Sequence, residues 1–166
     1  MLSLRRAGEG DLGFMMATER IDAYALQVGR WGEPRHRASL ADPSFAYLIG
    51  EKHGEPIGFA ILRTLNDPNG NIGLQRIVVA SPGQGLGSEL LARVTDWVFT
   101  ETACHRFLLE VFTDNVRARR VYARHGFVEE GVLRQVVKRL DGTRSDQVLM
   151  SLLRPEWQAA RAGFSS

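Results

Sequence analysis

Two short motifs contain the residues whose types and spacing could do chemistry. The first is glycine-rich: Gly83, Gly85 and Gly87 follow a β-branched segment that ends at Ser81-Pro82, and an amphipathic stretch of helical period comes next. A strand that leads through such a turn into a helix forms a place for phosphate. The first helical N–H groups lack intrahelical partners there, and the helix dipole is positive. The alternative is a tight turn that binds no ligand.

The glycine spacing matches neither of the common nucleotide motifs. A dinucleotide-binding turn has the pattern Gly-x-Gly-x-x-Gly, whereas residues 83–87 have Gly-x-Gly-x-Gly. A P-loop needs Gly-Lys-Ser/Thr after four spacers, and no lysine lies near this turn. We therefore expect a phosphate ligand of another kind, and the second motif indicates which.

The second motif has an asparagine, a small residue and a tyrosine at helical spacing. Asn115 begins it, Ala118 and Tyr122 lie four residues apart and so share one helix face, and Gly126-Phe127 ends it. The asparagine amide can cap the helix or reach the amide groups of a ligand. Taken alone, Tyr122 would more often be a core residue than a catalyst.

In this order and separation, the two motifs together resemble the GNAT superfamily of N-acetyltransferases. The resemblance covers residues 75–127, and residues 149–157 are similar to members that acetylate protein or peptide N-termini. One position departs from the family signature Arg/Gln-x-x-Gly-x-Gly/Ala, because Pro82 stands where Arg or Gln is usual and Gln84 lies two residues away. The backbone amides of the turn remain, so we expect binding to survive.

The resemblance implies that acetyl-CoA is the co-substrate and that its acetyl group passes directly to a primary amine. It implies that one strand pairs with the pantetheine arm, that the glycine-rich turn holds the pyrophosphate, and that Asn115 contacts the pantetheine. It also implies that Tyr122 protonates the departing thiolate, and a phenol with a pKa near ~10 is a suitable proton source. The implied acetyl-CoA-binding residues are Ile77, Val78, Val79, Gln84, Gly85, Leu86, Gly87, Ser88 and Asn115.

The general base is less well defined. Members of the family often have a glutamate on the strand before the turn, but this strand carries Gly73 and Gln75. Glu110 is more simply a structural hydrogen-bonding residue, so a water chain is the safest interpretation. One acidic and two aromatic residues would suit a cationic amine if they border the acceptor site. These substrate-binding candidates are Glu19, Tyr24 and Trp31.

Three classes of function stay open at this point. The expected acceptor is a protein or peptide N-terminal amine, and the alternative is a small-molecule amine such as a polyamine, amino acid or antibiotic. An acyl-CoA-binding sensor without turnover would fit the missing glutamate and Pro82, but a binder needs no proton donor such as Tyr122. The row Arg117, Arg120 and Arg124 forms one basic helix face, which is more simply solvated than bound to phosphate.

Length and composition indicate one globular domain. The 166 residues are 44% hydrophobic and 24% charged, which is ordinary for a globular protein. No apolar run reaches membrane-spanning length, and the N-terminus lacks the apolar core of a signal peptide. The four histidines show no metal-ligand spacing with Cys104, so no metal is expected. A net charge of +2 and a single cysteine favour a cytoplasmic protein without nucleic-acid or membrane partners, and a homodimer is left open.

The elements that must position the two motifs form an α+β pattern. A helix joins the strand before the glycine-rich turn to the apolar strand at 106–113, so these two strands should be parallel. The strands before them form an antiparallel meander, and a hairpin around Asp141-Gly142 closes the chain. We expect a mixed, mostly antiparallel twisted sheet of about seven strands with helices on both faces.

The expected boundaries follow from periodicity and turn residues. Residues 1–157 should form a single domain, residues 158–166 a loosely attached tail, and residues 20–43 loops and a short helix. The strands are expected at 2–5, 44–51, 56–65, 74–80, 106–113, 127–139 and 145–153, and the helices at 11–19, 86–98 and 115–125.

Overall fold

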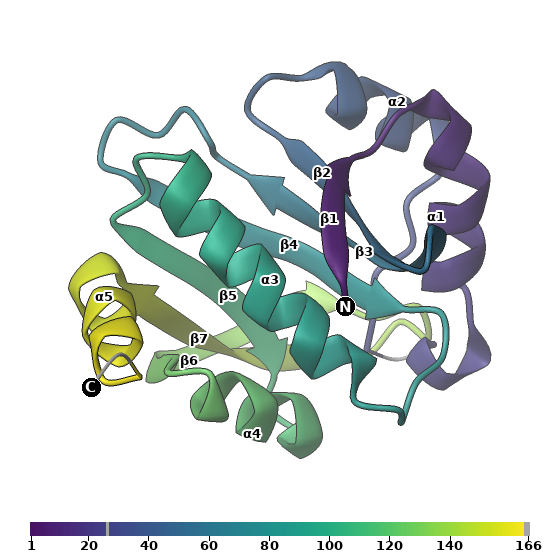
Figure 1. The fold of residues 1–166 in the computed structure, drawn as a ribbon. Helices are drawn as coiled ribbons and strands as arrows, with labels where there is room; N and C mark the ends of the chain where they lie inside the picture. Colours follow the sequence, from purple (N-terminus) through teal and green to yellow (C-terminus); the bar gives the residue numbers. More distant parts are fainter. Residues whose placement is uncertain (26, 165–166) are drawn as a thin grey trace.

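The computed structural model describes residues 1–25 and 27–164. At its centre is one seven-stranded sheet in the order β1-β2-β3-β4-β5-β7-β6 (Figure 1). β4 and β5 run parallel, and all the other neighbouring strands are antiparallel, as the sequence predicts. The strands are β1 (Ser3–Arg6), β2 (Ala46–Lys52), β3 (Glu55–Arg63), β4 (Asn71–Val79), β5 (Arg106–Phe112), β6 (Val128–Lys138) and β7 (Arg144–Leu153).

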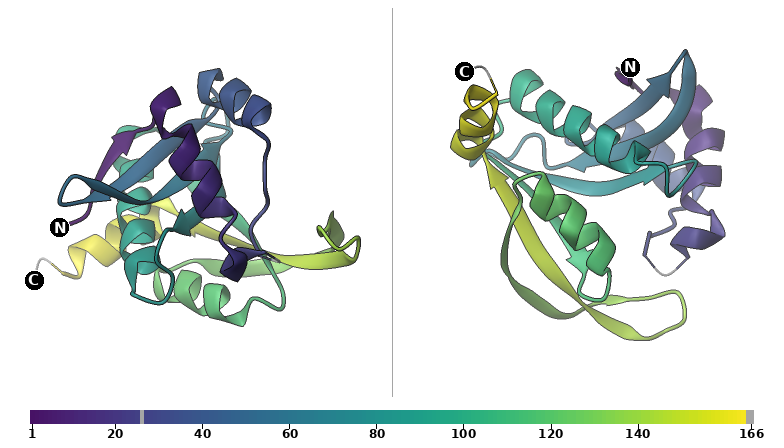
Figure 2. Two further views of the ribbon diagram at one scale, coloured as in Figure 1. Left: turned by 90° about the vertical axis from the view of Figure 1, so that its right-hand side faces the viewer. Right: turned by 60° about the horizontal axis from the view of Figure 1, so that its bottom comes forward.

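Helices cover both faces of the sheet, which confirms the predicted layering. α3 and α4 lie on one face, and α1 and α2 lie on the other (Figure 1, Figure 2). A 3-10 turn, η2 (Asp22–Tyr24), follows α1, and another, η1 (Glu9–Asp11), precedes it. The helices are α1 (Leu12–Glu19), α2 (Glu33–Ala41), α3 (Leu86–Glu101), α4 (Val116–Arg124) and α5 (Arg154–Ala162).

Each face of the sheet has its own hydrophobic core. Leu90 and Val94 of α3 are fully buried in one core, and Met15 of α1 is fully buried in the other. β4 contributes to both, because successive side chains of a strand point to opposite faces. Its Val79 packs in the α3 core, and the adjacent Val78 packs in the α1 core. β4 is therefore held in place from both sides.

β4 and β5 separate halfway along their length. Their pairing covers only Asn71 to Leu74 on β4, opposite Arg106 to Leu109 on β5. Beyond this point β4 stays paired with β3 as far as Val79, and β5 stays paired with β7 as far as Phe112. The sheet thus contains a gap between β4 and β5, at the end where β4 enters the glycine-rich turn.

A β-bulge marks the point at which β4 leaves β5. Ile61 of β3 pairs with Arg76, whereas its neighbour Leu62 pairs with Leu74, so Gln75 is an extra residue on β4. A bulge bends its strand and increases the local twist. Pairing with β5 ends at Leu74, immediately before this extra residue. The bulge therefore explains why β4 turns away from β5 while it remains paired with β3.

The C-terminal helix α5 differs from the sequence prediction. Residues 158–162 belong to α5, so the boundary predicted after Trp157 falls inside a helix, and residues 165 and 166 lie outside the described part. The Trp157 ring stacks on Phe99 of α3 at 5.1 Å between centroids. Arg154 donates hydrogen bonds of 2.8–3.0 Å to the carbonyl oxygens of Phe99, Thr102 and Cys104. These contacts secure the C-terminal end of α3.

Gly58→Ala tests the packing that holds β4 on β3. A Cβ at Gly58 would lie 2.5 Å from the carbonyl oxygen of Val78 and 3.0 Å from Val79 Cγ1. A backbone oxygen cannot move without displacing β4, so we expect the free energy of unfolding to fall by about 1–3 kcal/mol in urea denaturation. The control is Gly13→Ala in α1, where a Cβ meets nothing within 4 Å. It should leave the stability unchanged or slightly higher. Wild-type stability of Gly58→Ala would contradict the β3–β4 packing.

Candidate functional site

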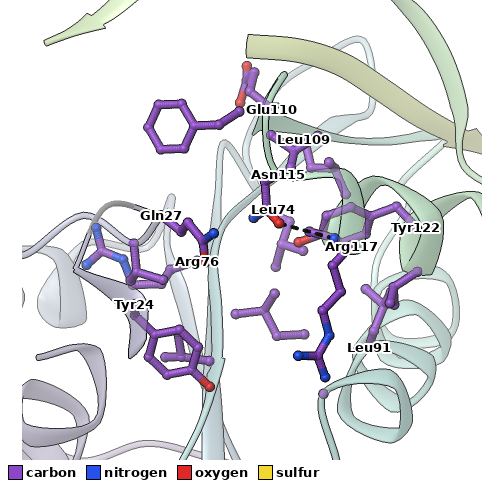
Figure 3. Close-up of a pocket in the computed structure, with 18 of the residues that line it drawn as sticks. Tyr24, Gln27, Leu74, Arg76, Leu91, Leu109, Glu110, Asn115, Arg117 and Tyr122 are labelled. Carbon is purple, nitrogen blue, oxygen red and sulfur yellow. Dashed lines mark hydrogen bonds between the residues drawn. The ribbon is translucent and has the colours of Figure 1, made fainter. Parts of the chain in front are cut away.

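A cavity of about 1250 Å³ opens where β4 and β5 diverge (Figure 3). The glycine-rich turn, α4, the segment from η2 to α2, and the hairpin of β6 and β7 all contribute to its walls. Both sequence motifs therefore meet at one place. The predicted site residues that line the cavity are Tyr24, Trp31, Ile77, Val78, Val79, Gly85, Gly87, Ser88, Asn115 and Tyr122. Three predicted site residues do not line the cavity: Glu19, Gln84 and Leu86.

The glycine-rich turn has the form that a phosphate ligand requires. Gly83 and Gly85 have φ of +86° and +75°, a region that favours glycine. A Cβ at Gly83, Gly85 or Gly87 would meet nothing within 4 Å, so the turn leaves open space beside its backbone. The first helical bond of α3 runs from the Glu89 N–H to the Gly85 oxygen at 3.2 Å. The N–H groups between these two residues are therefore free of intrahelical partners.

The outer half of β4 offers backbone groups to the gap. The Ala80 N–H donates to the Ile57 oxygen at 2.8 Å, so the backbone of Ala80 faces β3. Backbone groups alternate in direction along a strand, so Val78 also faces β3, whereas Ile77 and Val79 face the gap. The hydroxyl of Tyr24 donates to the Val79 oxygen at 2.8 Å from the gap side. The expectation that the Val78 backbone pairs with a ligand is therefore wrong, because β3 already takes it.

α4 presents its polar residues to the cavity. Asn115 caps the helix, since its Oδ1 accepts a hydrogen bond of 3.2 Å from the Ala118 N–H. The Tyr122 ring packs against Phe127 at 5.8 Å, and its hydroxyl points into the cavity (Figure 3). Burial raises the pKa of Tyr122 to about 12, because a phenolate would be poorly solvated there. At neutral pH the phenol is protonated and can donate.

Glu19 is not available to a substrate, contrary to the sequence prediction. Its side chain is fully buried and has three partners. Arg76 Nη1 lies 2.7 Å from its Oε2, while His36 Nε2 and Arg20 Nη1 lie 2.9 and 3.0 Å from its Oε1. The other ring nitrogen of His36, Nδ1, lies 3.0 Å from the Tyr47 hydroxyl. Glu19 thus balances charge inside the protein, because a buried carboxylate needs such partners.

Trp31 lines the cavity, but its ring already carries the protein's own cations. The guanidinium carbon of Arg35 lies 3.8 Å from the ring centroid, and that of Arg76 lies 4.9 Å away. The ring is thus not an empty platform for a cationic amine, as the sequence suggested. The sequence did not indicate these two contacts, because Arg76 lies far from Trp31 along the chain and Arg35 falls within residues 20–43, where no regular element was expected.

The basic face of α4 also borders the cavity. Arg117, Arg120 and Arg124 are exposed, and all three line the wall. Ser88 Oγ and His125 Nε2 share a hydrogen bond of 2.7 Å, which joins the start of α3 to the end of α4. Burial and then the charge of Arg124 lower the pKa of His125. The arginines therefore lie on the helix that is joined to the glycine-rich turn.

Glu110 is the one carboxylate among the described residues that line the cavity. It lies on β5 and forms an ion pair with Arg63 of β3, at 2.8 Å between Arg63 Nη2 and Glu110 Oε2. Both side chains are about one quarter exposed. The structural role expected from sequence is thus present, and the carboxylate also reaches the cavity.

Two kinds of feature are absent from residues 1–25 and 27–164. No group of three or more His, Cys, Asp or Glu side chains there could hold a metal ion. No helix in the same residues is long and apolar enough to cross a membrane.

Comparison with known proteins assigns the family. The model of the Acetyltransferase (GNAT) family matches residues 15–127. A relative from Methanocaldococcus jannaschii, described as an uncharacterized N-acetyltransferase, is 30% identical over 109 residues, which are 66% of this chain and 67% of that protein. The chain belongs to the GNAT acetyltransferase family, and it is an N-acetyltransferase.

Solved structures share nearly the whole fold. A spermidine N-acetyltransferase from Vibrio cholerae, in complex with CoA and spermine, has a TM-score of 0.83 at 24% identity, over 95% of this chain and 98% of that chain. A ribosomal-protein-S18-alanine N-acetyltransferase from Escherichia coli has a TM-score of 0.75 at 23% identity, over 92% and 94% of the two chains. These similarities confirm the predicted GNAT fold.

The pKa of Glu19 links this buried charge to stability. Burial alone would raise that pKa, but the hydrogen bond with His36 and the charges of Arg76, His36 and Arg20 lower it below its ordinary value of 4.5. The folded state therefore binds the proton less tightly than the unfolded chain. The stabilising contribution is complete above pH 4.5 and is lost as the pH falls through the folded pKa.

Glu19→Gln should lower the free energy of unfolding by about 3–5 kcal/mol at pH 7, because Arg76 stays buried without its counter-charge. It should also flatten the loss of stability below pH 4.5. Chemical denaturation over a pH series measures both effects. The control, Glu33→Gln, removes a half-exposed carboxylate that pairs with Arg37 on the surface of α2 and should change stability little. Equal stability of Glu19→Gln and wild type at pH 7 would refute the role of this buried pair.

Proposed function

We propose that this protein transfers the acetyl group of acetyl-CoA directly to a primary amine. The observation that carries the proposal is the gap between β4 and β5. It runs from the open glycine-rich turn, past the backbone edges of Ile77 and Val79, to the Tyr122 hydroxyl. An extended pantetheine arm with two amides can pair with such a strand edge as an added strand would.

The residues around the gap suit the parts of acetyl-CoA. The free N–H groups of Leu86, Gly87 and Ser88 at the start of α3 would hold the pyrophosphate, as helix N-termini hold anions. Arg120 and Arg124 of α4 would add positive charge for the phosphates. These arginines would supply positive charge for the phosphates even though Pro82 stands at the position where the family usually has Arg or Gln. We infer that this cradle binds acetyl-CoA.

Tyr122 and Asn115 would act on the thioester end. The Asn115 carbonyl oxygen is engaged in capping, which leaves its NH₂ group to donate to a pantetheine oxygen. The Tyr122 phenol would donate its proton to the sulfur atom that leaves as CoA. Its raised pKa keeps that proton in place at neutral pH until the sulfur requires it. We propose Tyr122 as the general acid.

The proton of the attacking amine needs a route out of the cavity. Glu110 is the carboxylate that lines the described wall, and its pair with Arg63 holds it in place. We propose that water carries the proton from the amine and that Glu110 helps to receive it. An α-amine with a pKa near ~8 would place a smaller demand on this route than a lysine-like amine near ~10.4.

The acceptor is the finer part of the proposal. The similarity of fold to the ribosomal-protein N-acetyltransferase and the sequence of residues 149–157 favour a protein or peptide N-terminal amine. The similarity to the spermidine N-acetyltransferase supports a small-molecule amine as the alternative. Both acceptors present a primary amine, so the chemistry at the gap is the same for each.

Assembly and location complete the proposal. Val128, Val132 and Val136 are exposed on β6, which is an edge strand of the sheet. A second copy that covered this open edge would pair its free backbone groups, so a homodimer is part of the proposal. Cys104 is buried as a free thiol, which suits the reducing cytoplasm.

Tyr122→Phe tests the enzyme proposal against a sensor that binds without turnover. We expect thiol release from acetyl-CoA to slow by about 10²- to 10⁴-fold, because the proton donor is lost. Acetyl-CoA binding, measured by calorimetry, should stay unchanged, since the phenyl ring keeps its contact with Phe127. The control is Thr100→Val, which removes an exposed hydroxyl on α3 outside the cavity and should keep wild-type turnover. Unchanged turnover in Tyr122→Phe would refute the proposed acid.

A further inference from the structure

The two faces of the sheet divide the cavity between donor and acceptor. The glycine-rich turn leads into α3 and the basic arginines lie on α4, so the phosphates of acetyl-CoA belong to the α3 face. Trp31 and Arg76 belong to the opposite face, which α1 and α2 cover. If the acetyl group sits in the gap, the amine has to arrive from this opposite face. This step, like the inference below, rests on the proposed function.

The wall of the acceptor side is basic. The guanidinium of Arg35 stacks on Trp31 at 3.8 Å, and that of Arg76 lies 4.9 Å from the same ring. Burial lowers the pKa of Arg76, and the charge of Arg35 acts in the same direction. Lys138 of β6 also lines the cavity. Positive charge is therefore concentrated where the acceptor would lie.

The nearby carboxylates do not neutralise this wall. Glu19 is shared among Arg76, Arg20 and His36, and it is fully buried. Glu110 is paired with Arg63. Within the described part of the chain, Arg35 has no hydrogen bond or ion pair, and its guanidinium is held only by the Trp31 ring. An oriented guanidinium without a counter-ion is a ready partner for a carboxylate, because its planar fork matches both oxygens.

We propose that the acceptor is a primary amine with a carboxylate close to it, and that Arg35 binds this carboxylate. Arg76, fixed by Glu19, adds positive potential, and the Trp31 edge contacts the apolar part of the acceptor. A polyamine would bring extra positive charges to this wall and be repelled. A free amino acid and a peptide that begins with an acidic residue both carry a carboxylate close to a primary amine.

The first test compares matched acceptors by thiol release from acetyl-CoA. The panel contains L-amino acids with their carboxamides, peptide amides that begin with Asp or Asn, and spermidine. We expect each carboxylate to exceed its uncharged counterpart by about 10-fold or more in kcat/KM. A preference for amino acids over Asp-peptides, or the reverse, identifies the source of the carboxylate. Equal or better use of carboxamides or spermidine would overturn the inference but leave the proposed function intact.

The second test removes the cation. Arg35→Gln should raise KM for the carboxylate acceptor by about 10- to 100-fold and leave KM for acetyl-CoA and for the carboxamide unchanged. Arg35→Lys, which keeps the charge but not the fork, should recover part of the loss. The matched control is Arg37→Gln on the same helix, whose side chain pairs with Glu33 and Glu9 outside the cavity.

Two results would contradict the role of Arg35. If Arg35→Gln raises KM equally for carboxylate and carboxamide, the residue acts on packing and does not recognise the carboxylate. If no amine releases thiol with the wild-type protein, the proposed function fails and this inference fails with it. The panel therefore separates failure of the acceptor class from failure of the enzyme.

Discussion

The structure depends on one constraint: β4 must leave β5 while it stays fully paired with β3. The extra residue Gln75 provides the bend, and the side chains of Leu74 and Val78 anchor the strand in two different cores. The departure exposes backbone groups in the middle of a sheet, where unpaired polar groups are costly. The Tyr24 hydroxyl satisfies the Val79 oxygen, and the remaining groups face the cavity. The gap is thus a missing strand position that a ligand of extended form can fill.

A buried charge network supports the other side of the gap. Glu19 fixes Arg76 on β4, and Arg76 in turn flanks Trp31, on which Arg35 also stacks. Such a network is held by mutual hydrogen bonds, because one unpaired member would be a buried charge. It gives the proposed acceptor side a fixed positive wall, while the helix start and α4 give the proposed donor side another. We therefore infer that the cavity can orient two charged molecules on opposite faces of one sheet.

The fold, and the two motifs that meet at the gap, could be predicted from the sequence because they depend on local patterns. The turn at Gly83–Gly87, the α4 motif with Asn115 and Tyr122, and the parallel crossover between β4 and β5 all depend on residues close together along the chain. The opposite wall of the cavity depends on contacts between residues that lie far apart along the chain, such as Arg76 with Trp31 and with Glu19. No periodicity reports such contacts, so the sequence suggested a substrate role for Glu19. Arg35, four residues from Trp31, was missed because residues 20–43 were expected to be largely irregular. The direction of the Val78 backbone depends on strand register, which the sequence does not contain.

The measurement that tests the account most directly is a calorimetric titration of the protein with acetyl-CoA and, separately, with 3′-phosphoadenosine 5′-diphosphate. The second ligand keeps the nucleotide and the pyrophosphate but lacks the pantetheine arm, and NAD and ATP serve as controls. If the gap pairs with the pantetheine, acetyl-CoA should bind at least about 10-fold more tightly than the diphosphate, and NAD and ATP should bind weakly. Equal affinity for the two ligands, or no binding of acetyl-CoA, would contradict the central claim.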